Sequence, residues 1–111
     1  GAIIGVCEGL LYAYKAGLDC NAVIDLLSEG AAGSFSLKVY GPRIMNRDFE
    51  PGFFVEHFFK DLGIALSESK RMGLDLKGLT LAHAIYDSMN KDGYDKKGIQ
   101  SLYLSLEFLF N

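Results

Sequence analysis

Two neighbouring charged residues, Lys60 and Asp61, are the first candidates for chemistry in this sequence. An ammonium and a carboxylate can donate and accept strong, charge-assisted hydrogen bonds. Both stand on the polar side of a strongly apolar segment, next to Gly63, where a neighbouring surface could come close. The residues alone favour a plainer interpretation, a solvated helix face on which Glu56 and Lys60 form an i,i+4 ion pair.

Aromatic and histidine side chains are the next candidates. Phe53 and Phe54 stand at the corner between a loop and a helix, where bulky aromatics are more often core anchors than ligand contacts. His57 and His83 lie 26 positions apart, and neither has a second ligand at metal-binding spacing. We therefore expect no metal site.

The composition limits the class of protein. The chain has 111 residues, of which 50% are hydrophobic and 23% charged, with a formal net charge of −3. These values predict one ordered domain. No Lys/Arg run exceeds two residues and no apolar stretch approaches the roughly 20 residues of a membrane span, so we expect neither a nucleic-acid nor a membrane partner.

The two cysteines indicate a reducing compartment. Cys7 and Cys20 are too few for a disulfide scaffold or a four-cysteine zinc site, and no secretory signal is visible, so we expect a cytoplasmic location. Cys7 lies on an apolar stripe and is interpreted as a small core residue. Cys20 opens a helix, where a thiolate could be favoured, but no basic partner is identifiable.

Several motifs of complete enzymes are missing from the sequence. It has no glycine-rich dinucleotide fingerprint after a strand, no phosphate loop, no paired-histidine zinc motif and no nucleophile elbow. This chain therefore carries no complete catalytic machinery.

Helical periodicity defines the elements that must position these residues. Apolar residues recur every three or four positions, and no segment alternates over a convincing strand length, so we predict an all-α domain of about six helices. The helices are expected from Ile3 to a stop at Gly17, from a cap at Asp19 to Gly30, from a cap at Ser34 onward, from Phe54 to near Gly73, from Leu79 to Gly93, and from Ile99 to Phe110.

Proline and glycine positions predict the interruptions. Pro42 lacks an N–H and disfavours helix at its predecessor, so we expect a break or bend at Gly41–Pro42. The stretch from Asn46 to Gly52 is the clearest loop. Leu18 and Leu74 each follow a glycine and precede an aspartate, which indicates two helices that end in the same way.

The two ends of the sequence suggest partners. The last helix is also apolar on its other side, through Leu104 and Phe108, and a helix that is apolar around most of its circumference needs two partners. We therefore predict a homodimer or larger homo-oligomer. The chain opens directly into a helical pattern without a cap, so we expect Gly1 to lie inside a longer helix, with more protein upstream.

Several fragments together resemble the carboxy-terminal domain of the β-hydroxyacid dehydrogenase family, which includes 3-hydroxyisobutyrate and tartronate semialdehyde dehydrogenases. The resemblance spans essentially the whole chain. Its most specific part, Lys60-Asp61-Leu62-Gly63-Ile64-Ala65, matches the family's cofactor motif K-D-L-G-x-A-x-D through six positions, and Ser67 stands where the final acid is expected. The other fragments are Glu8-Gly9-Leu10-Leu11, Lys15-Ala16-Gly17-Leu18-Asp19, Arg47-Asp48-Phe49-Glu50-Pro51-Gly52-Phe53 and Gly98-Ile99-Gln100-Ser101-Leu102.

The resemblance implies a fold and an activity. Residues 1–111 would be an all-α, substrate-side and dimerisation domain like those of 6-phosphogluconate-dehydrogenase-like proteins. An amino-terminal Rossmann domain, absent from this chain, would bind most of the NAD or NADP and supply the catalytic lysine. The implied reaction is hydride transfer between the nicotinamide and a small 3-hydroxy acid or its semialdehyde, and the fragment alone would be inactive.

The resemblance also assigns roles to three residues. Lys60 would reach the nicotinamide-ribose side of the cofactor, Asp61 would support Lys60 and the hydrogen-bond network, and Phe53 would help to wall the substrate pocket. The alternative is a non-enzymatic, all-α oligomerisation or interaction module, which is consistent with the apolar last helix and the incomplete machinery. Replacement of Lys60 discriminates between the two.

Overall fold

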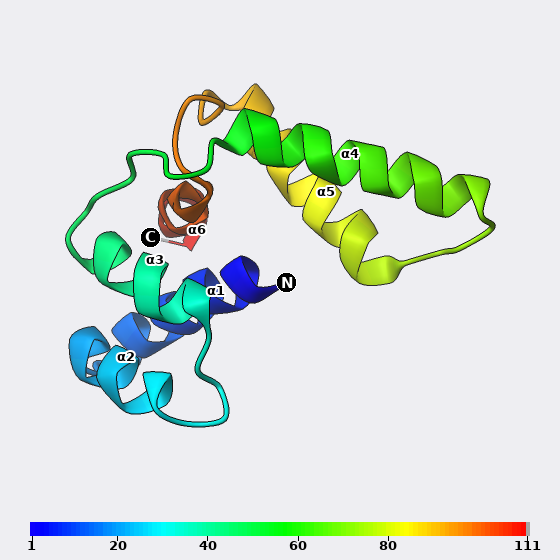
Figure 1. Ribbon diagram of the computed structural model, residues 1–111. Coiled ribbons are helices and arrows are strands. Elements are labelled where there is room, and N and C mark those ends of the chain that lie inside the picture. Colours follow the sequence, from blue (N-terminus) through cyan, green and yellow to red (C-terminus); the bar gives the residue numbers. More distant parts are fainter. Residues whose placement is uncertain (111) are drawn as a thin grey trace. The chain divides into compact units, whose positions relative to one another are not determined.

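The computed structural model describes residues 1–110 of the chain. Within this range the protein is all-α, as predicted, and its only strand-like feature is an isolated bridge between Phe54 and Gly98. Residues 1–110 form six α-helices, which Figure 1 labels, and the short 3-10 helix η1 (Ile99–Ser101) directly precedes the last one. Their bounds are α1 (Ala2–Lys15), α2 (Cys20–Ser28), α3 (Phe35–Met45), α4 (Val55–Arg71), α5 (Lys77–Lys91) and α6 (Leu102–Phe110).

The helices form two compact units. The hairpin unit comprises Glu50–Ile99 together with Gly1, and the bundle unit comprises Ala2–Phe49 and Gln100–Asn111. In the bundle unit, α1 packs against α2, α3 and α6. Its core comes mainly from the apolar stripe of α1, with residues from the other three helices: Ile3, Val6, Cys7, Leu10, Leu11, Ala13, Cys20, Ile24, Leu37, Ile44, Leu102 and Tyr103.

The hairpin unit is built on the pairing of α4 with α5, which lie side by side in Figure 1. Its fully buried side chains include Val55, Tyr86 and Met89. The Tyr86 hydroxyl donates a hydrogen bond of 2.9 Å to the carbonyl oxygen of Ile99. This bond connects α5 to the end of the segment that follows it. The core of this unit therefore lies near the start of α4 and the end of α5.

Helix ends follow the predicted signals. Gly17 and Gly73 both have a positive φ, +80° and +77°, a conformation in which glycine avoids the strain of a Cβ atom. The next residue in each case donates back across the last turn, Leu18 to Ala13 and Leu74 to Ser69, as in a Schellman motif. The two Gly-Leu-Asp stops are thus equivalent local structures.

Caps at helix starts are also confirmed. The Asp19 carboxylate accepts hydrogen bonds from the backbone N–H groups of Asn21 and Ala22, at 3.0 and 3.3 Å. The Ser34 hydroxyl accepts one from the Leu37 N–H at 3.0 Å. These side chains satisfy donors that the first helical turn leaves unpaired.

A break or a bend was predicted at Gly41–Pro42; the break is absent, because α3 runs through both residues. Pro42 accepts the helical hydrogen bond from the Asn46 N–H at 3.0 Å, so the ladder resumes after the proline. The proline ring normally clashes with the Cβ atom of the preceding residue, and Gly41 has none. Gly41 is buried against Ile24 of α2, so the same missing atom also permits close packing of the two helices.

Candidate functional site

The backbone segment that follows α5 fixes the start of α4, the helix that carries Lys60 and Asp61. Phe54 precedes α4 without a side-chain cap. Instead, the N–H groups of Val55 and Glu56 donate to the carbonyl oxygens of Lys97 and Asp95, at 2.9 and 3.1 Å. The segment that follows α5 therefore performs the capping that no side chain provides, and α4 has a fixed origin from which the next turns project.

Lys60 and Asp61 are both exposed on α4. Within residues 1–110, neither the Lys60 ammonium nor the Asp61 carboxylate takes part in a side-chain hydrogen bond or ion pair. The expected Glu56–Lys60 pair is absent from these residues because Glu56 binds Lys96 instead, at 2.8 Å. That bond lowers the pKa of Glu56 and raises the pKa of Lys96. A cation and an anion thus remain available on adjacent positions for the oxygen and nitrogen atoms of a ligand.

Gly63 of α4 faces His83 of α5. A Cβ atom on Gly63 would stand 3.5 Å from the Nε2 atom of His83, which is ordinary van der Waals contact. The His83 ring stacks on Phe59, with 4.9 Å between ring centroids and 27° between the planes. The neighbouring surface expected beside Gly63 is therefore α5 of the same unit, and His83 is a packed side chain.

Phe53 is half-buried at the start of the same unit. Its ring contacts Phe58 with a centroid distance of 5.5 Å, and Phe58 meets Tyr86 edge-on at 4.9 Å. The Phe53 carbonyl oxygen accepts a hydrogen bond from the Ile99 N–H at 2.9 Å. The core-anchor interpretation of Phe53 is supported, and its partial exposure leaves part of the ring available to a ligand.

The final position of the resembled motif lacks an acid in the structure as well. Ser67 is exposed. Glu68, the next residue, binds the Arg71 side chain with an Nε–Oε1 distance of 2.8 Å. That carboxylate is already paired with Arg71, so it does not supply the missing acid as a free charge.

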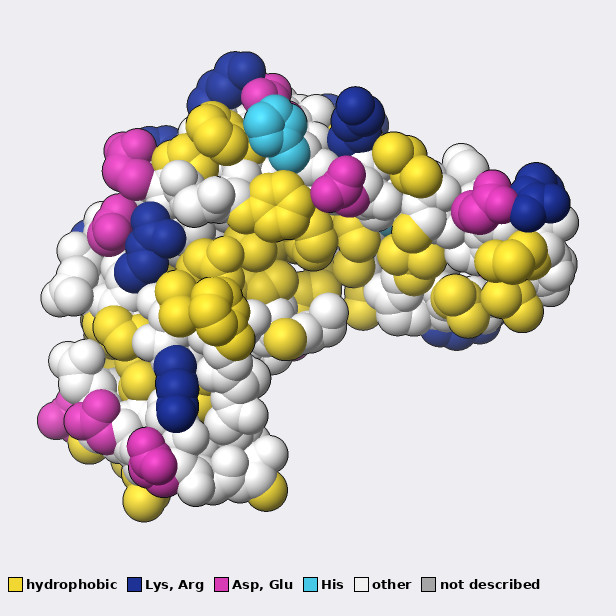
Figure 2. Space-filling model, viewed as in Figure 1, with side chains coloured by type: hydrophobic (Ala, Val, Ile, Leu, Met, Phe, Trp, Pro, Cys, Tyr) yellow, Lys and Arg dark blue, Asp and Glu magenta, His cyan; other side chains and the backbone are white. Residues whose placement is uncertain are grey.

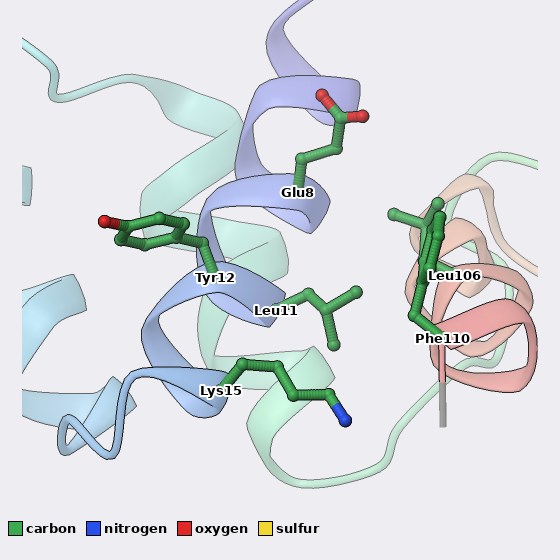
Figure 3. Close-up of a pocket in the computed structure, with 6 residues that line it drawn as sticks. All are labelled: Glu8, Leu11, Tyr12, Lys15, Leu106 and Phe110. Atoms are coloured by element: carbon green, nitrogen blue, oxygen red, sulfur yellow. The ribbon is translucent and has the colours of Figure 1, made fainter.

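A cavity of about 330 Å³ lies elsewhere, in the bundle unit between α1 and α6. Figure 3 shows the side chains that line it; they are Glu8, Leu11, Tyr12, Lys15, Leu106 and Phe110. None of the three predicted site residues belongs to this lining. Sequence reasoning missed the cavity because it depends on how two distant helices pack, although the spacing of its four α1 residues places them on one helix face.

Neither cysteine has the properties of a reactive thiol. Burial raises the pKa of Cys7 to about 12, and its thiol donates to the Gln100 carbonyl oxygen at 3.9 Å. Cys20 is also buried; desolvation raises its pKa, and its thiol donates to the Leu10 carbonyl oxygen at 3.6 Å. Among residues 1–110, no three His, Cys, Asp or Glu side chains gather closely enough to hold a metal ion.

The Lys60–Asp61 pair offers a donor and an acceptor at adjacent exposed positions of α4. An exposed ammonium can donate hydrogen bonds to ribose hydroxyl oxygens, and a carboxylate can accept them from ribose hydroxyls or the nicotinamide amide. The described part of the chain offers no glycine-rich turn between a strand and a helix for the pyrophosphate.

Solved structures share this fold. The fold is similar to that of a crystal structure of 3-hydroxyisobutyrate dehydrogenase from Salmonella typhimurium, with a TM-score of 0.87 and 22% identity over 93% of this chain and 36% of that one. The protein is thus an all-α domain of the kind found in that dehydrogenase. A family model described as NAD-binding of NADP-dependent 3-hydroxyisobutyrate dehydrogenase matches residues 1–106, and the chain belongs to this family.

Curated relatives agree with this assignment. The chain is 53% identical, over 98% of its length, to the probable 3-hydroxyisobutyrate dehydrogenase-like 1, mitochondrial, of Arabidopsis thaliana. It is 34% identical, also over 98% of its length, to the 2-hydroxy-3-oxopropionate reductase of Escherichia coli strain K12. It spans about a third of these relatives, 33% and 37% of their lengths. None of the helices between residues 1 and 110 combines the length and apolarity that a bilayer crossing requires.

Proposed function

We propose that this chain forms the carboxy-terminal, substrate-side part of an NAD(P)-dependent oxidoreductase that acts on a small 3-hydroxy acid or its semialdehyde. The observation that carries the proposal is the adjacent, exposed Lys60 and Asp61, without side-chain partners among residues 1–110, inside the motif on α4. Membership of the family supports the class of reaction, and the names of the relatives support the class of substrate.

In this proposal the bound nicotinamide supplies hydride transfer, and the residues of this chain bind and orient. Lys60 donates hydrogen bonds to ribose or substrate carboxylate oxygens, and its charge opposes substrate charge more strongly in a closed cleft of low dielectric. Asp61 orients the Lys60 ammonium and accepts hydrogen bonds from the ligand. The exposed part of the Phe53 ring excludes water from the substrate side.

The rest of the machinery belongs, in this proposal, to a Rossmann domain outside this sequence. That domain would bind most of the cofactor and provide the lysine that handles the substrate hydroxyl proton. The 111-residue chain alone would therefore turn over no NAD(P)H. A measurable rate of NAD(P)H oxidation by the purified chain would contradict this division of labour.

The proposal includes self-association and a cytoplasmic location. Exposed apolar side chains at the end of α6 support self-association, with Phe108, Leu109 and Phe110 exposed by 84%, 66% and 64%. The names of several relatives place those proteins in mitochondria.

Lys60→Ala in the full-length protein tests the enzymatic proposal. We expect KM for NAD(P)H to rise, or kcat to fall, by about tenfold or more, because a charge-assisted hydrogen bond is worth roughly 1.5–3 kcal/mol. Lys70→Ala is the matched control, since Lys70 is an exposed lysine on the same helix and should leave both constants unchanged. Steady-state kinetics with both cofactors provide the measurement.

The same variant discriminates the second candidate, a non-enzymatic all-α oligomerisation module, which the exposed end of α6 favours. A module of that kind would show altered assembly or no change in Lys60→Ala, and no cofactor dependence at all. If the parent protein shows turnover and Lys60→Ala has the same KM and kcat, the protein is an oxidoreductase but Lys60 does not have the proposed role.

A further inference from the structure

Lys96 is held over the first turn of α4 by the backbone on both sides of it. The preceding residue, Asp95, accepts a hydrogen bond from the Glu56 N–H at 3.1 Å. The following residue, Lys97, accepts one from the Val55 N–H at 2.9 Å. These main-chain bonds place Lys96 beside the Glu56 carboxylate, and its Nζ atom donates to Oε1 at 2.8 Å.

Glu56 has a second cation within reach on its own helix. Lys60 follows it by four positions, and a glutamate four residues before a lysine is the favourable order for an ion pair on a helix. In the structure Glu56 nevertheless binds Lys96, and Lys60 has no side-chain partner among residues 1–110. The Nε2 atom of His57 lies 3.8 Å from the same Oε1 atom, which is too far for a hydrogen bond. The partner of Glu56 therefore decides whether the Lys60 ammonium is available.

We propose that Lys96 is a positioning residue, which holds the Glu56 carboxylate away from Lys60 and thereby keeps the Lys60 ammonium available to NAD(P)H. Because the backbone around Lys96 is already fixed, its pairing with Glu56 costs less conformational entropy than pairing between two mobile segments. This role rests on the proposed function, in which Lys60 contacts the cofactor. All of the residues involved belong to the hairpin unit.

Loss of Lys96 would leave Glu56 charged. Glu56 lies in the first turn of α4, where the helix dipole favours a negative charge. The ordinary pKa of a glutamate is also far below neutral pH. Without Lys96, the ionised carboxylate would therefore pair with Lys60 and occupy the donors that the ligand needs.

Lys96→Met in the full-length protein tests this role. Methionine keeps an aliphatic stem and removes the charge, so that Glu56 is released toward Lys60. We expect the dissociation constant for NAD(P)H to rise about twofold, because the cofactor must then displace an exposed i,i+4 ion pair. Fluorescence titration of the reduced cofactor provides the measurement. Lys96→Arg retains the charge and should bind NAD(P)H like the parent.

Two double variants give the decisive result. In K96M/E56Q the carboxylate that would occupy Lys60 is neutral, so the affinity should return to that of the parent. In K96M/K60A no ammonium is left to occupy, so Lys96→Met should cause no loss beyond that of Lys60→Ala alone. A general effect of the lost positive charge would instead persist in the Lys60→Ala background.

Lys97→Met is the charge-matched control. Lys97 is an exposed lysine of the same segment, and its side chain makes no ion pair within residues 1–110, so its replacement should leave the affinity unchanged. The role of Lys96 is overturned if Lys96→Met binds NAD(P)H like the parent, or if it causes an equal loss with and without Lys60. In both cases a parent that binds more tightly than Lys60→Ala retains the proposed function. If Lys60→Ala itself binds like the parent, the proposed contact of Lys60 is wrong and the role of Lys96 is wrong with it.

Discussion

The cationic side chains of this chain differ in whether an anion is bound to them. Arg47 makes two hydrogen bonds of 3.0 Å to the Glu107 carboxylate, and its guanidinium lies 5.4 Å from the centre of the Phe49 ring. Lys60 has no such partner among residues 1–110. A paired cation has its charge neutralised and its donors occupied, so the unpaired one is better suited to a ligand oxygen.

Arg47 also occupies an unusual backbone position. Its φ of 56° is in the left-handed region, which non-glycine residues adopt at a cost of roughly 1–2 kcal/mol. The conformation closes α3, because it lets the Asp48 N–H donate to the Arg43 carbonyl oxygen at 2.8 Å. The two hydrogen bonds to Glu107 help to offset the cost of a side chain where glycine is the usual residue.

Glu107→Gln should destabilise the protein in a pH-dependent way. Hydrogen bonding to Arg47 lowers the pKa of Glu107 in the folded protein. Its contribution is therefore present above the unfolded-state pKa, and it is lost as the pH falls through the lower, folded-state value. Because Arg47 is largely exposed, we expect a loss of at most about 1 kcal/mol in the free energy of unfolding at pH 7.

Urea denaturation at a series of pH values checks this prediction. The difference between parent and Glu107→Gln should be largest near neutral pH and should shrink toward zero below the usual range of a glutamate. Glu29→Gln is the control, because Glu29 is exposed at the carboxy-terminal end of α2 and makes no side-chain ion pair within residues 1–110. A constant difference from pH 7 to pH 3 would show that Glu107 acts through packing alone.

Among the helices, α3 contains two residues that usually end helices, Gly41 and Pro42, and its continuity depends on the glycine preceding the proline. Gly41→Ala would add a Cβ atom 3.2 Å from the Cδ1 atom of buried Ile24, and would restore the clash with the Pro42 ring. We expect a loss of about 1–3 kcal/mol, although alanine is normally the better helix former by roughly 1 kcal/mol. Thermal denaturation followed at 222 nm would measure it.

A double-mutant cycle separates the two causes. In a Pro42→Ala background the clash with the ring is absent, so Gly41→Ala should cost less there than in the parent. Whatever loss persists is due to Ile24. Should Gly41→Ala stabilise the parent, the absence of a Cβ atom would not be the reason that α3 continues through the proline.

The sequence predicted those elements whose causes are local. Periodic apolar residues, caps and glycine stops depend on neighbours within one or two turns. The structure has the caps at Asp19 and Ser34, and Gly17, Gly73 and Gly93 have the positive φ of a helix stop. The break expected at Pro42 is absent because Gly41 has no Cβ atom to clash with the proline ring. The prediction did not take this into account. Glu56 pairs with Lys96, 40 positions away, which no helix-spacing rule could reveal.

In the candidate site, too, only the features with local causes could be predicted from the sequence. Periodicity placed Lys60 and Asp61 on the polar face of a helix, and both are exposed on α4. Their interpretation as cofactor contacts came from the resemblance of a whole motif, because one turn of helix cannot distinguish a ligand site from a solvated face. The groove between α1 and α6 required the packing of residues nearly a hundred positions apart.

At the scale of the whole molecule, burial is unevenly distributed. Between residues 64 and 81, which include the end of α4 and the start of α5, Ser69 is the only buried residue. Figure 2 shows hydrophobic side chains at the surface of this end of the hairpin, and the large ones exposed by 45% or more are Ile64, Met72, Leu74, Leu76 and Leu81. This end is therefore held by few apolar contacts, although it presents apolar surface that a further domain or subunit could cover.

Hydrogen exchange should reveal this difference directly. Local opening of residues 64–81 exposes little buried apolar surface, whereas opening of α1 exposes the core of the bundle unit, so the free energy of opening should be smaller in the hairpin end. In the 111-residue chain we expect amides of residues 64–81 to exchange at least tenfold faster than those of residues 3–13, as measured by mass spectrometry of peptides. In the full-length oxidoreductase that we propose, coverage of the same apolar end should slow its exchange, while residues 3–13 change less. Equal protection of the two segments in the chain alone would show that contacts along α4 and α5 suffice to stabilise the hairpin end, and it would remove the reason to expect a covering partner there.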